Sequence, residues 1–102
     1  MKLPRTYYEQ INEAINRQKI PLKSFSFTKK RGWIHINHHP TNSYFSFFRK
    51  KSVTISSQTH QWESSETFKI KPSDGDPQQK ESWHGVMESL IAWLADIPKQ
   101  AL

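Results

Sequence analysis

Apolar residues between positions 83 and 97 recur three and four positions apart, which is the spacing of one face of an α-helix. The opposite side of the segment is polar, so the pattern predicts an amphipathic helix over about 82–97. Ser82 is placed to cap its first turn, and we expect Pro98 to end it because proline lacks the amide proton. Trp93 lies at the margin of the apolar face, where we expect a core or boundary residue rather than a partner-binding patch. The apolar positions are Trp83, Val86, Met87, Leu90, Ile91, Leu94 and Ile97.

A second amphipathic segment lies near the N-terminus. Tyr8, Ile11 and Ile15 form a narrow apolar stripe, which predicts a helix over about 6–18 at the edge of the core. Thr6 and Glu9 have the spacing of a capping box, and Pro21 follows as a stop.

Between these two segments the apolar period changes to two, which is typical of half-buried strands. Residues 29–32 predict a basic hairpin turn in which Gly32 adopts a positive φ, and 49–51 a second basic turn. Residues 57–65 form a polar connection interrupted by Trp62, and 72–77 are a predicted loop. The predicted strands are 24–28, 33–37, 44–48, 53–56 and 67–71.

Consecutive strands joined by short turns usually pair as an antiparallel meander. One face of this meander collects apolar residues, and the C-terminal helix is its best cover, with the first helix beside it. The predicted fold is therefore α+β: a single domain over residues 1–102, with a five-stranded antiparallel meander and both terminal helices packed on one face (α-β5-α). The apolar face would hold Phe25, Phe27, Ile34, Ile36, Phe45, Phe47, Val53, Ile55, Phe68 and Ile70.

The other face of the predicted sheet is open to solvent, as one face of an antiparallel sheet can be. Strand alternation places Trp33, Tyr44 and Phe48 on it, where exposed rings can stack on bases while basic side chains track phosphates. The same rings could instead pack against one another, be covered by the connection that carries Trp62, or lie in a sheet-to-sheet homodimer. The remaining positions of this face are Ser24, Ser26, Thr28, His35, Asn37, Ser46, Thr54, Ser56, Lys69 and Lys71.

The formal net charge of +6 is unevenly distributed along the chain. No acidic residue occurs between Glu13 and Glu63, whereas acidic residues outnumber lysines from Glu63 onward. Such asymmetry is typical of a basic face that attracts an anionic partner, although a charged surface also serves solubility. The positive residues of the acid-free interval are Arg17, Lys19, Lys23, Lys29, Lys30, Arg31, Arg49, Lys50 and Lys51.

Motifs for catalysis are missing from the sequence. There is no cysteine, no glycine-rich phosphate loop, no G-x-S-x-G and no H-E-x-x-H. His60, Glu63 and Glu66 could be drawn as an acid–base set, but they lie in a polar connection with no apolar pocket to raise a carboxylate pKa. We therefore expect a protein that is not an enzyme.

Histidines are the only candidate metal ligands besides carboxylates. His35, His38 and His39 could bind a metal if His60 or a carboxylate joined them, but their spacing matches no established ligand motif. We expect no metal and no other cofactor.

No apolar run approaches the length of a membrane span, and no signal-peptide pattern follows Met1. Without cysteines there is also no disulfide framework. We expect a cytoplasmic protein with no membrane attachment.

The sequence thus predicts a small binding module whose basic, aromatic-bearing sheet engages an anionic partner, with nucleic acid the first choice. The alternative is a protein-interaction module, such as a small inhibitor, immunity or adaptor protein, that docks on an acidic protein. A homodimer through the open sheet face is a further arrangement. The predicted binding residues are Lys29, Lys30, Arg31, Trp33, His35, Tyr44, Phe48, Arg49, Lys50 and Lys51.

Overall fold

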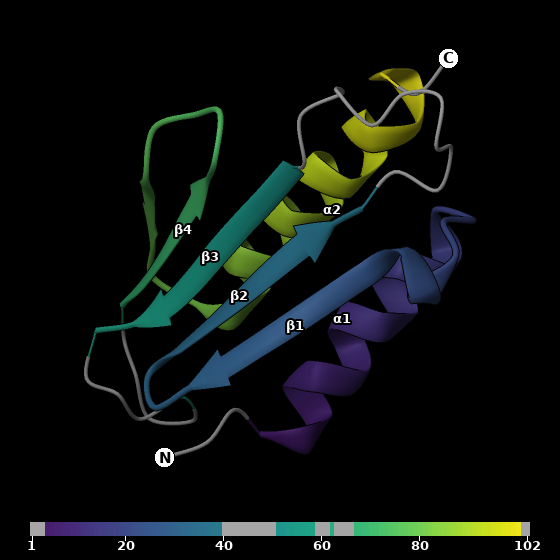
Figure 1. The fold of residues 1–102 in the computed structure, drawn as a ribbon. Helices are drawn as coiled ribbons and strands as arrows, with labels where there is room; N and C mark the ends of the chain where they lie inside the picture. The colour runs from purple at the N-terminus through teal and green to yellow at the C-terminus, as the bar shows by residue number, and fades with distance from the viewer. Residues whose placement is uncertain (1–3, 40–50, 59–61, 63–66, 101–102) are drawn as a thin grey trace.

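A computed structural model describes residues 4–39, 51–58, 62 and 67–100 of the chain. Figure 1 shows one sheet in front of two helices, and both helices lie on the same side of it. The strand order is β1-β2-β3-β4-β5 and every neighbouring pair is antiparallel, so the α+β fold with an α-β5-α arrangement is confirmed. The elements are α1 (Arg5–Arg17), the 3-10 helix η1 (Leu22–Ser24), β1 (Phe25–Lys30), β2 (Trp33–His38), β3 (Lys51–Ser57), β4 (Phe68–Pro72), β5 (Gln78–Lys80) and α2 (Trp83–Gln100).

The sheet contains one strand that the sequence pattern did not predict. β2 pairs with β3 along its whole length, and residues 44–48, predicted as the third strand, lie outside the described residues. The fifth strand of the sheet is β5, at residues that the sequence pattern assigned to no element. Its Gln-Gln-Lys sequence lacks apolar alternation, so only the backbone groups of β4 that it pairs with identify it as a strand.

The core lies between the sheet and the two helices. Strand alternation placed the apolar side chains correctly, because every described member of the predicted apolar face is buried except Phe27, which is half-buried against the core. Phe45 and Phe47 lie outside the described residues. The side chains with no exposed surface are Ile11, Ile15, Ile34, Ile36, Ile55, Trp62, Val86, Leu90 and Leu94.

Trp62 is the largest of these buried side chains. Its ring centroid lies 6.2 Å from that of Phe68 and 6.2 Å from that of Trp83. Trp83 in turn stacks on Tyr7 of α1 at 4.0 Å. The hypothesis that Trp62 covers the open face is therefore wrong. The indole turns to the helix side, because it buries more apolar area there than on a polar face.

The beginning of α1 does not use the predicted capping box. The N-cap position is occupied by Pro4, and no side chain caps the helix. Glu9 instead accepts a hydrogen bond from the Nε of Arg5 at 3.0 Å, one helical turn earlier. The helix ends just before Lys19, which adopts the left-handed conformation with φ 59°, so Pro21 is not its stop.

Ser82 caps α2 as predicted, because its Oγ accepts a hydrogen bond from the amide of Gly85 at 3.1 Å. Pro98 does not end this helix, which continues to Gln100. Its missing amide removes a single backbone bond in the last turn, where helix ends already leave groups unpaired. Within the described residues, neither helix has the length and apolarity needed to cross a membrane.

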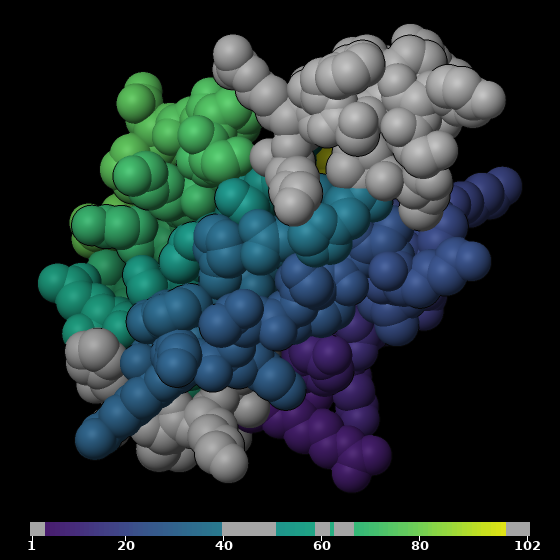
Figure 2. Space-filling model, in the orientation of Figure 1, coloured from purple at the N-terminus to yellow at the C-terminus, as the bar shows by residue number. Residues whose placement is uncertain are grey.

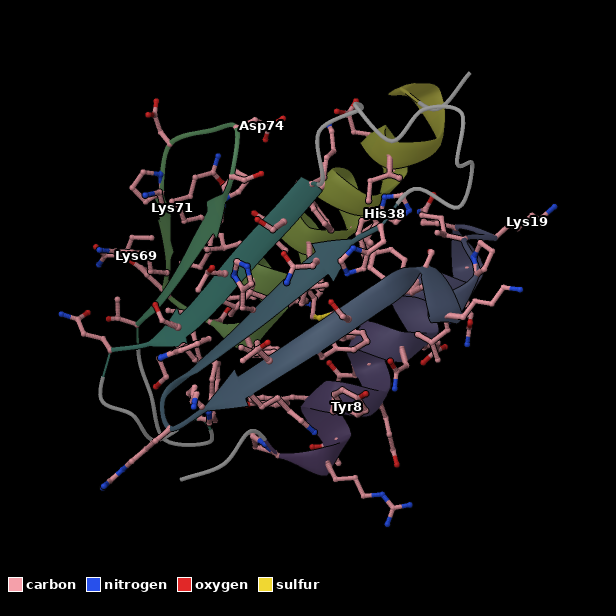
Figure 3. All side chains as sticks on the ribbon, viewed as in Figure 1. Tyr8, Lys19, His38, Lys69, Lys71 and Asp74 are labelled. Carbon is pink, nitrogen blue, oxygen red and sulfur yellow. The ribbon has the colours of Figure 1, made fainter. Side chains whose placement is uncertain are left out.

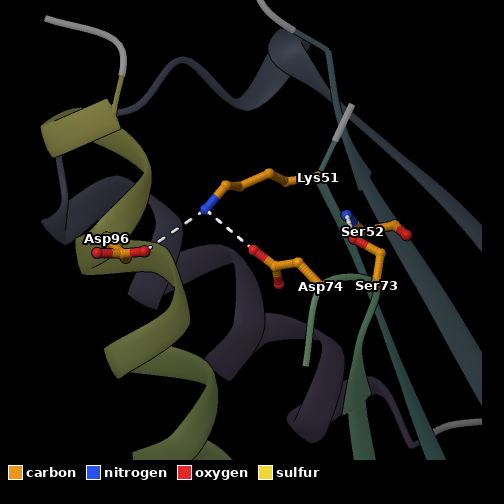
Figure 4. A network of polar contacts seen from close by, with 5 residues as sticks. All are labelled: Lys51, Ser52, Ser73, Asp74 and Asp96. Atoms are coloured by element: carbon orange, nitrogen blue, oxygen red, sulfur yellow. Dashed lines mark hydrogen bonds and ion pairs between the residues drawn. The ribbon is translucent and has the colours of Figure 1, made fainter. Parts of the chain in front are cut away.

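Lys51 ties three elements together on the helix side of the sheet (Figure 4). Its Nζ lies 3.6 Å from Asp74 in the β4–β5 loop and 3.4 Å from Asp96 of α2, and its side chain is only 14% exposed. Beside it, the amide of Ser52 donates to the Oγ of Ser73 at 3.2 Å. The prediction that Lys51 belongs to a basic turn is therefore wrong: it is a strand residue whose charge is compensated from both sides.

We expect Lys51→Ala to lower the free energy of unfolding by about 1–2 kcal/mol, because Asp74 and Asp96 then lose the cation between them while solvent screens part of the cost. Urea denaturation measures the change. Lys71→Ala is the matched control, since this exposed strand lysine makes no ion pair among the described residues and should stay within about 0.5 kcal/mol. Equal effects of the two substitutions would contradict the assignment.

Candidate functional site

The face of the sheet away from the helices, here called the open face, is formed by every second residue of each strand. Side chains of β1, β2 and β3 form a continuous surface in Figure 2, with β4 and the loop that follows it beside them. Trp33 and His35 of β2 are half-buried there, while Ile34 and Ile36, which alternate with them, are buried on the helix side. The residues of the open face are Ser26, Thr28, Lys30, Trp33, His35, Asn37, Ser52, Thr54, Ser56, Lys69, Lys71 and Gln79.

Strand register aligns these residues in rows across the sheet. One row has Trp33 opposite Ser56, and Ser56 opposite Lys69. Lys30 lies beyond Trp33 on β1, and Gln79 beyond Lys69 on β5, in the same row. The row therefore contains a ring between two lysines.

The next row of the open face repeats much of this arrangement. His35 lies opposite Thr54, and Thr54 opposite Lys71. On the other side of His35, β1 contributes Thr28 where the first row has Lys30. In both rows, therefore, β2 contributes a ring, β3 a hydroxyl and β4 a lysine.

Two hollows are lined by residues of the open face. The first is lined by Trp33, His35 and the hydroxyl residues around them, and has a volume of about 460 Å³. The second, of about 200 Å³, includes Lys69 and Gln79. Ser56 lines both, so it lies between the hollow beside the rings of β2 and the hollow beside Lys69 of β4.

The charge of the sheet is entirely positive, because none of its five strands contains an acidic residue. Alternation divides the six strand lysines equally between the two sides. Lys29, Lys51 and Lys80 face the helices, and Lys30, Lys69 and Lys71 face the open side. Among the described residues, the three lysines of the open face make no ion pair.

The predicted basic turn of residues 29–32 is divided by the structure. The turn proper is Arg31-Gly32, in which Gly32 has the expected positive φ of 84°. β1 continues to Lys30, so Lys29 falls on the helix side, where its Nζ lies 4.3 Å from the centre of the Tyr8 ring. Lys29 is thus separated from Trp33 by the sheet, whereas Lys30 is its neighbour.

Several predicted binding residues lie outside the described residues, namely Tyr44, Phe48, Arg49 and Lys50. Ser24 was expected on the open face, but it is buried in η1 and donates its hydroxyl proton to the carbonyl of Pro21 at 2.6 Å.

The histidines near the open face have separate partners. His35 Nδ1 lies 2.6 Å from the Thr54 hydroxyl, which fixes the ring across β2 and β3. His39 Nε2 lies 2.8 Å from the Ser26 hydroxyl, and His38 turns to the opposite side, where its ring meets Phe25 at 5.0 Å. The part of the chain that the structure describes contains no group of three potential metal ligands.

Burial, reinforced by the neighbouring His39 and Lys51, lowers the pKa of His38 below 6.5. The unfolded chain therefore takes up this proton at a higher pH than the folded chain, so His38 destabilises the fold as the pH falls below about 6.5 and has no effect above it. We expect His38→Gln to reduce the loss of melting temperature between about pH 7 and pH 5. His84→Gln, an exposed histidine of α2, is the control and should not reduce it. An unchanged pH profile in His38→Gln would contradict the proposed role of burial.

Sequence reasoning placed Lys69 and Lys71 on the open face but not among the binding residues. The alternation of Phe-Lys-Ile-Lys indicates which side they face. It does not indicate that they align with Trp33 and His35, because that register depends on pairing between segments far apart in the chain.

Comparison with known proteins adds no further constraint, because no family model, no curated protein and no solved structure matches this chain. A functional assignment therefore rests on the open face itself.

Proposed function

We propose that this protein is a non-enzymatic binding module whose open face engages nucleic acid. The observation that carries the proposal is the alignment, in the same rows, of aromatic rings with lysines that make no ion pair among the described residues, on a sheet without acidic residues. Rings of this kind stack on bases, and lysines neutralise phosphates. Trp33, His35, Lys30, Lys69 and Lys71 are the residues we assign to the interface.

The distribution of acidic residues supports this choice of face. Among the described residues, carboxylates occur only on the helices and in the segments that flank β5. Glu9 and Glu13 of α1 pair with arginines of their own helix, and Glu88 of α2 lies 3.0 Å from His84. A polyanion approaching the molecule would therefore be attracted to the sheet and not to the helices.

A fluorescence titration tests the proposal, with single-stranded RNA, single-stranded DNA and duplex DNA added to the full chain at about 50 mM salt. Binding should quench tryptophan emission with a dissociation constant of at most some tens of micromolar, because binding to phosphates is tighter at about 50 mM salt than at physiological salt. Lys30→Glu should weaken it, whereas Lys23→Glu, on η1 and off the open face, should weaken it less. The absence of binding to all three nucleic acids at tens of micromolar would reject the proposal, and an acidic protein would become the leading partner.

Trp33→Ala should weaken binding to single strands by about 1–3 kcal/mol while leaving the salt dependence nearly unchanged, because the indole supplies stacking and no charge. Trp33→Phe is the matched control and should retain most of the affinity, since a ring remains. A loss of the same size in Trp33→Phe, or none in Trp33→Ala, would argue against stacking at this position.

A further inference from the structure

We infer that the open face binds two successive nucleotides of a single strand, one on each row, with the bases over β2 and the phosphates over β4. This inference rests on the proposed function. It adds that the ligand is a single strand and that this strand runs parallel to β2. Its basis is that the two rows are equivalent units, Trp33–Ser56–Lys69 and His35–Thr54–Lys71.

The spacing of the rows selects a single strand. Trp33 and His35 are two residues apart on β2, so their Cα atoms are separated by roughly 6.6 Å. Successive bases in each strand of a double helix are only about 3.4 Å apart. Consecutive bases can therefore occupy both rings only if the strand is extended and its bases are unstacked from each other, which a duplex does not allow.

The lysines of β4 repeat at the same interval as the rings. Lys69 and Lys71 are also two residues apart, and Figure 3 shows them one after the other along β4. Each lies two strands from its ring, or roughly 9.6 Å across the sheet. A nucleotide strand that runs parallel to β2 would thus place one base on a ring and one phosphate near a lysine in each row.

The residue between ring and lysine is small and carries a hydroxyl in both rows. Ser56 and Thr54 both line the first hollow, where the sugars would lie. A larger side chain at either position would separate the ring from the lysine. The Thr54 hydroxyl also holds His35 at 2.6 Å, so the second ring is oriented before the ligand arrives.

Lys30 distinguishes the first row from the second. It lies on the side of Trp33 away from Lys69, where the outer edge of a stacked base would be. Base edges carry acceptor atoms, and an ammonium group can donate to them. The first row therefore has a cationic donor at the base edge, whereas the second row has the neutral hydroxyl of Thr28 there.

Salt dependence of binding to a short oligouridylate tests the inference with the full-length protein. On a single strand each neutralised phosphate contributes about −0.7 to the slope of log K against log salt. Lys69→Gln and Lys71→Gln should each make the slope less negative by about 0.7, and the double variant by about 1.4. Lys23→Gln, an exposed lysine of η1, should leave the slope unchanged. Lys69 and Lys71 are exposed, so circular dichroism should show folded variants.

The same experiment includes a duplex, made by annealing the oligouridylate to oligoadenylate. We expect the single strand to bind more tightly than the duplex, and His35→Ala to lower its affinity roughly 5- to 150-fold. Two results would overturn the two-nucleotide arrangement and leave the proposed function standing. One is equal affinity for the single strand and the duplex. The other is binding whose salt dependence is the same in wild type, Lys69→Gln and Lys71→Gln. Failure of every oligonucleotide to bind would reject both.

Discussion

Trp62→Ala is expected to lower the free energy of unfolding by about 3–5 kcal/mol, the largest effect of any single substitution that we predict. The indole has no exposed surface and packs against Phe68 and Trp83, so its removal loses this buried contact area and leaves a cavity in the core. Urea denaturation monitored by circular dichroism measures the loss as a lower midpoint.

Trp33→Ala is the matched control, because it removes the same type of side chain from a half-buried position on the open face. We expect it to cost less than Trp62→Ala, since the half-buried Trp33 keeps part of its surface in contact with water. Similar midpoints for the two variants would contradict the placement of Trp62 inside the core and Trp33 outside it.

Leu90→Ala is expected to lower the free energy of unfolding by about 2–5 kcal/mol, because Leu90 is fully buried at the centre of the apolar face of α2. The neighbouring residue provides the control: Ile91 is 41% exposed, so Ile91→Ala should cost about 1 kcal/mol or less. The two substitutions lie in the same helix and differ in whether the side chain faces the core or the solvent. A larger loss at Ile91 than at Leu90 would mean that α2 is rotated relative to the sheet.

The features that the sequence predicts well are those encoded by near neighbours. Spacing of three and four located α2 and its buried face, and alternation identified which side chains of β2, β3 and β4 face the helices. These patterns work because the side-chain period of a helix or strand is fixed by backbone geometry. They also placed Trp33 and His35 on the open face.

The features that were missed depend on contacts between distant segments. Lys51 follows Arg49 and Lys50 in the chain, and only the fold brings Asp74 and Asp96 to it. Trp62 stands alone among polar residues, so no periodicity indicated that it turns into the core. Lys69 and Lys71 belong to the candidate site because of their register with β3. The local sequence pattern does not predict this register either.

The measurement that tests the nucleic-acid proposal most directly is a two-dimensional ¹⁵N–¹H NMR titration with a single-stranded oligonucleotide. The chain has four tryptophans, and their indole N–H groups report on different parts of the molecule. Trp33 lies on the open face, Trp62 is buried in the core, and Trp83 donates its indole proton to Gln10 at 2.7 Å on the helix side. Trp33→Phe identifies the Trp33 signal by its disappearance.

The proposal predicts that the indole signal of Trp33 and the amides of β2, β3 and β4 shift progressively as the oligonucleotide is added, while the indole signals of Trp62 and Trp83 remain in place. Shifts confined to α1 and α2, or a spectrum that does not change up to a large molar excess of oligonucleotide, would contradict it.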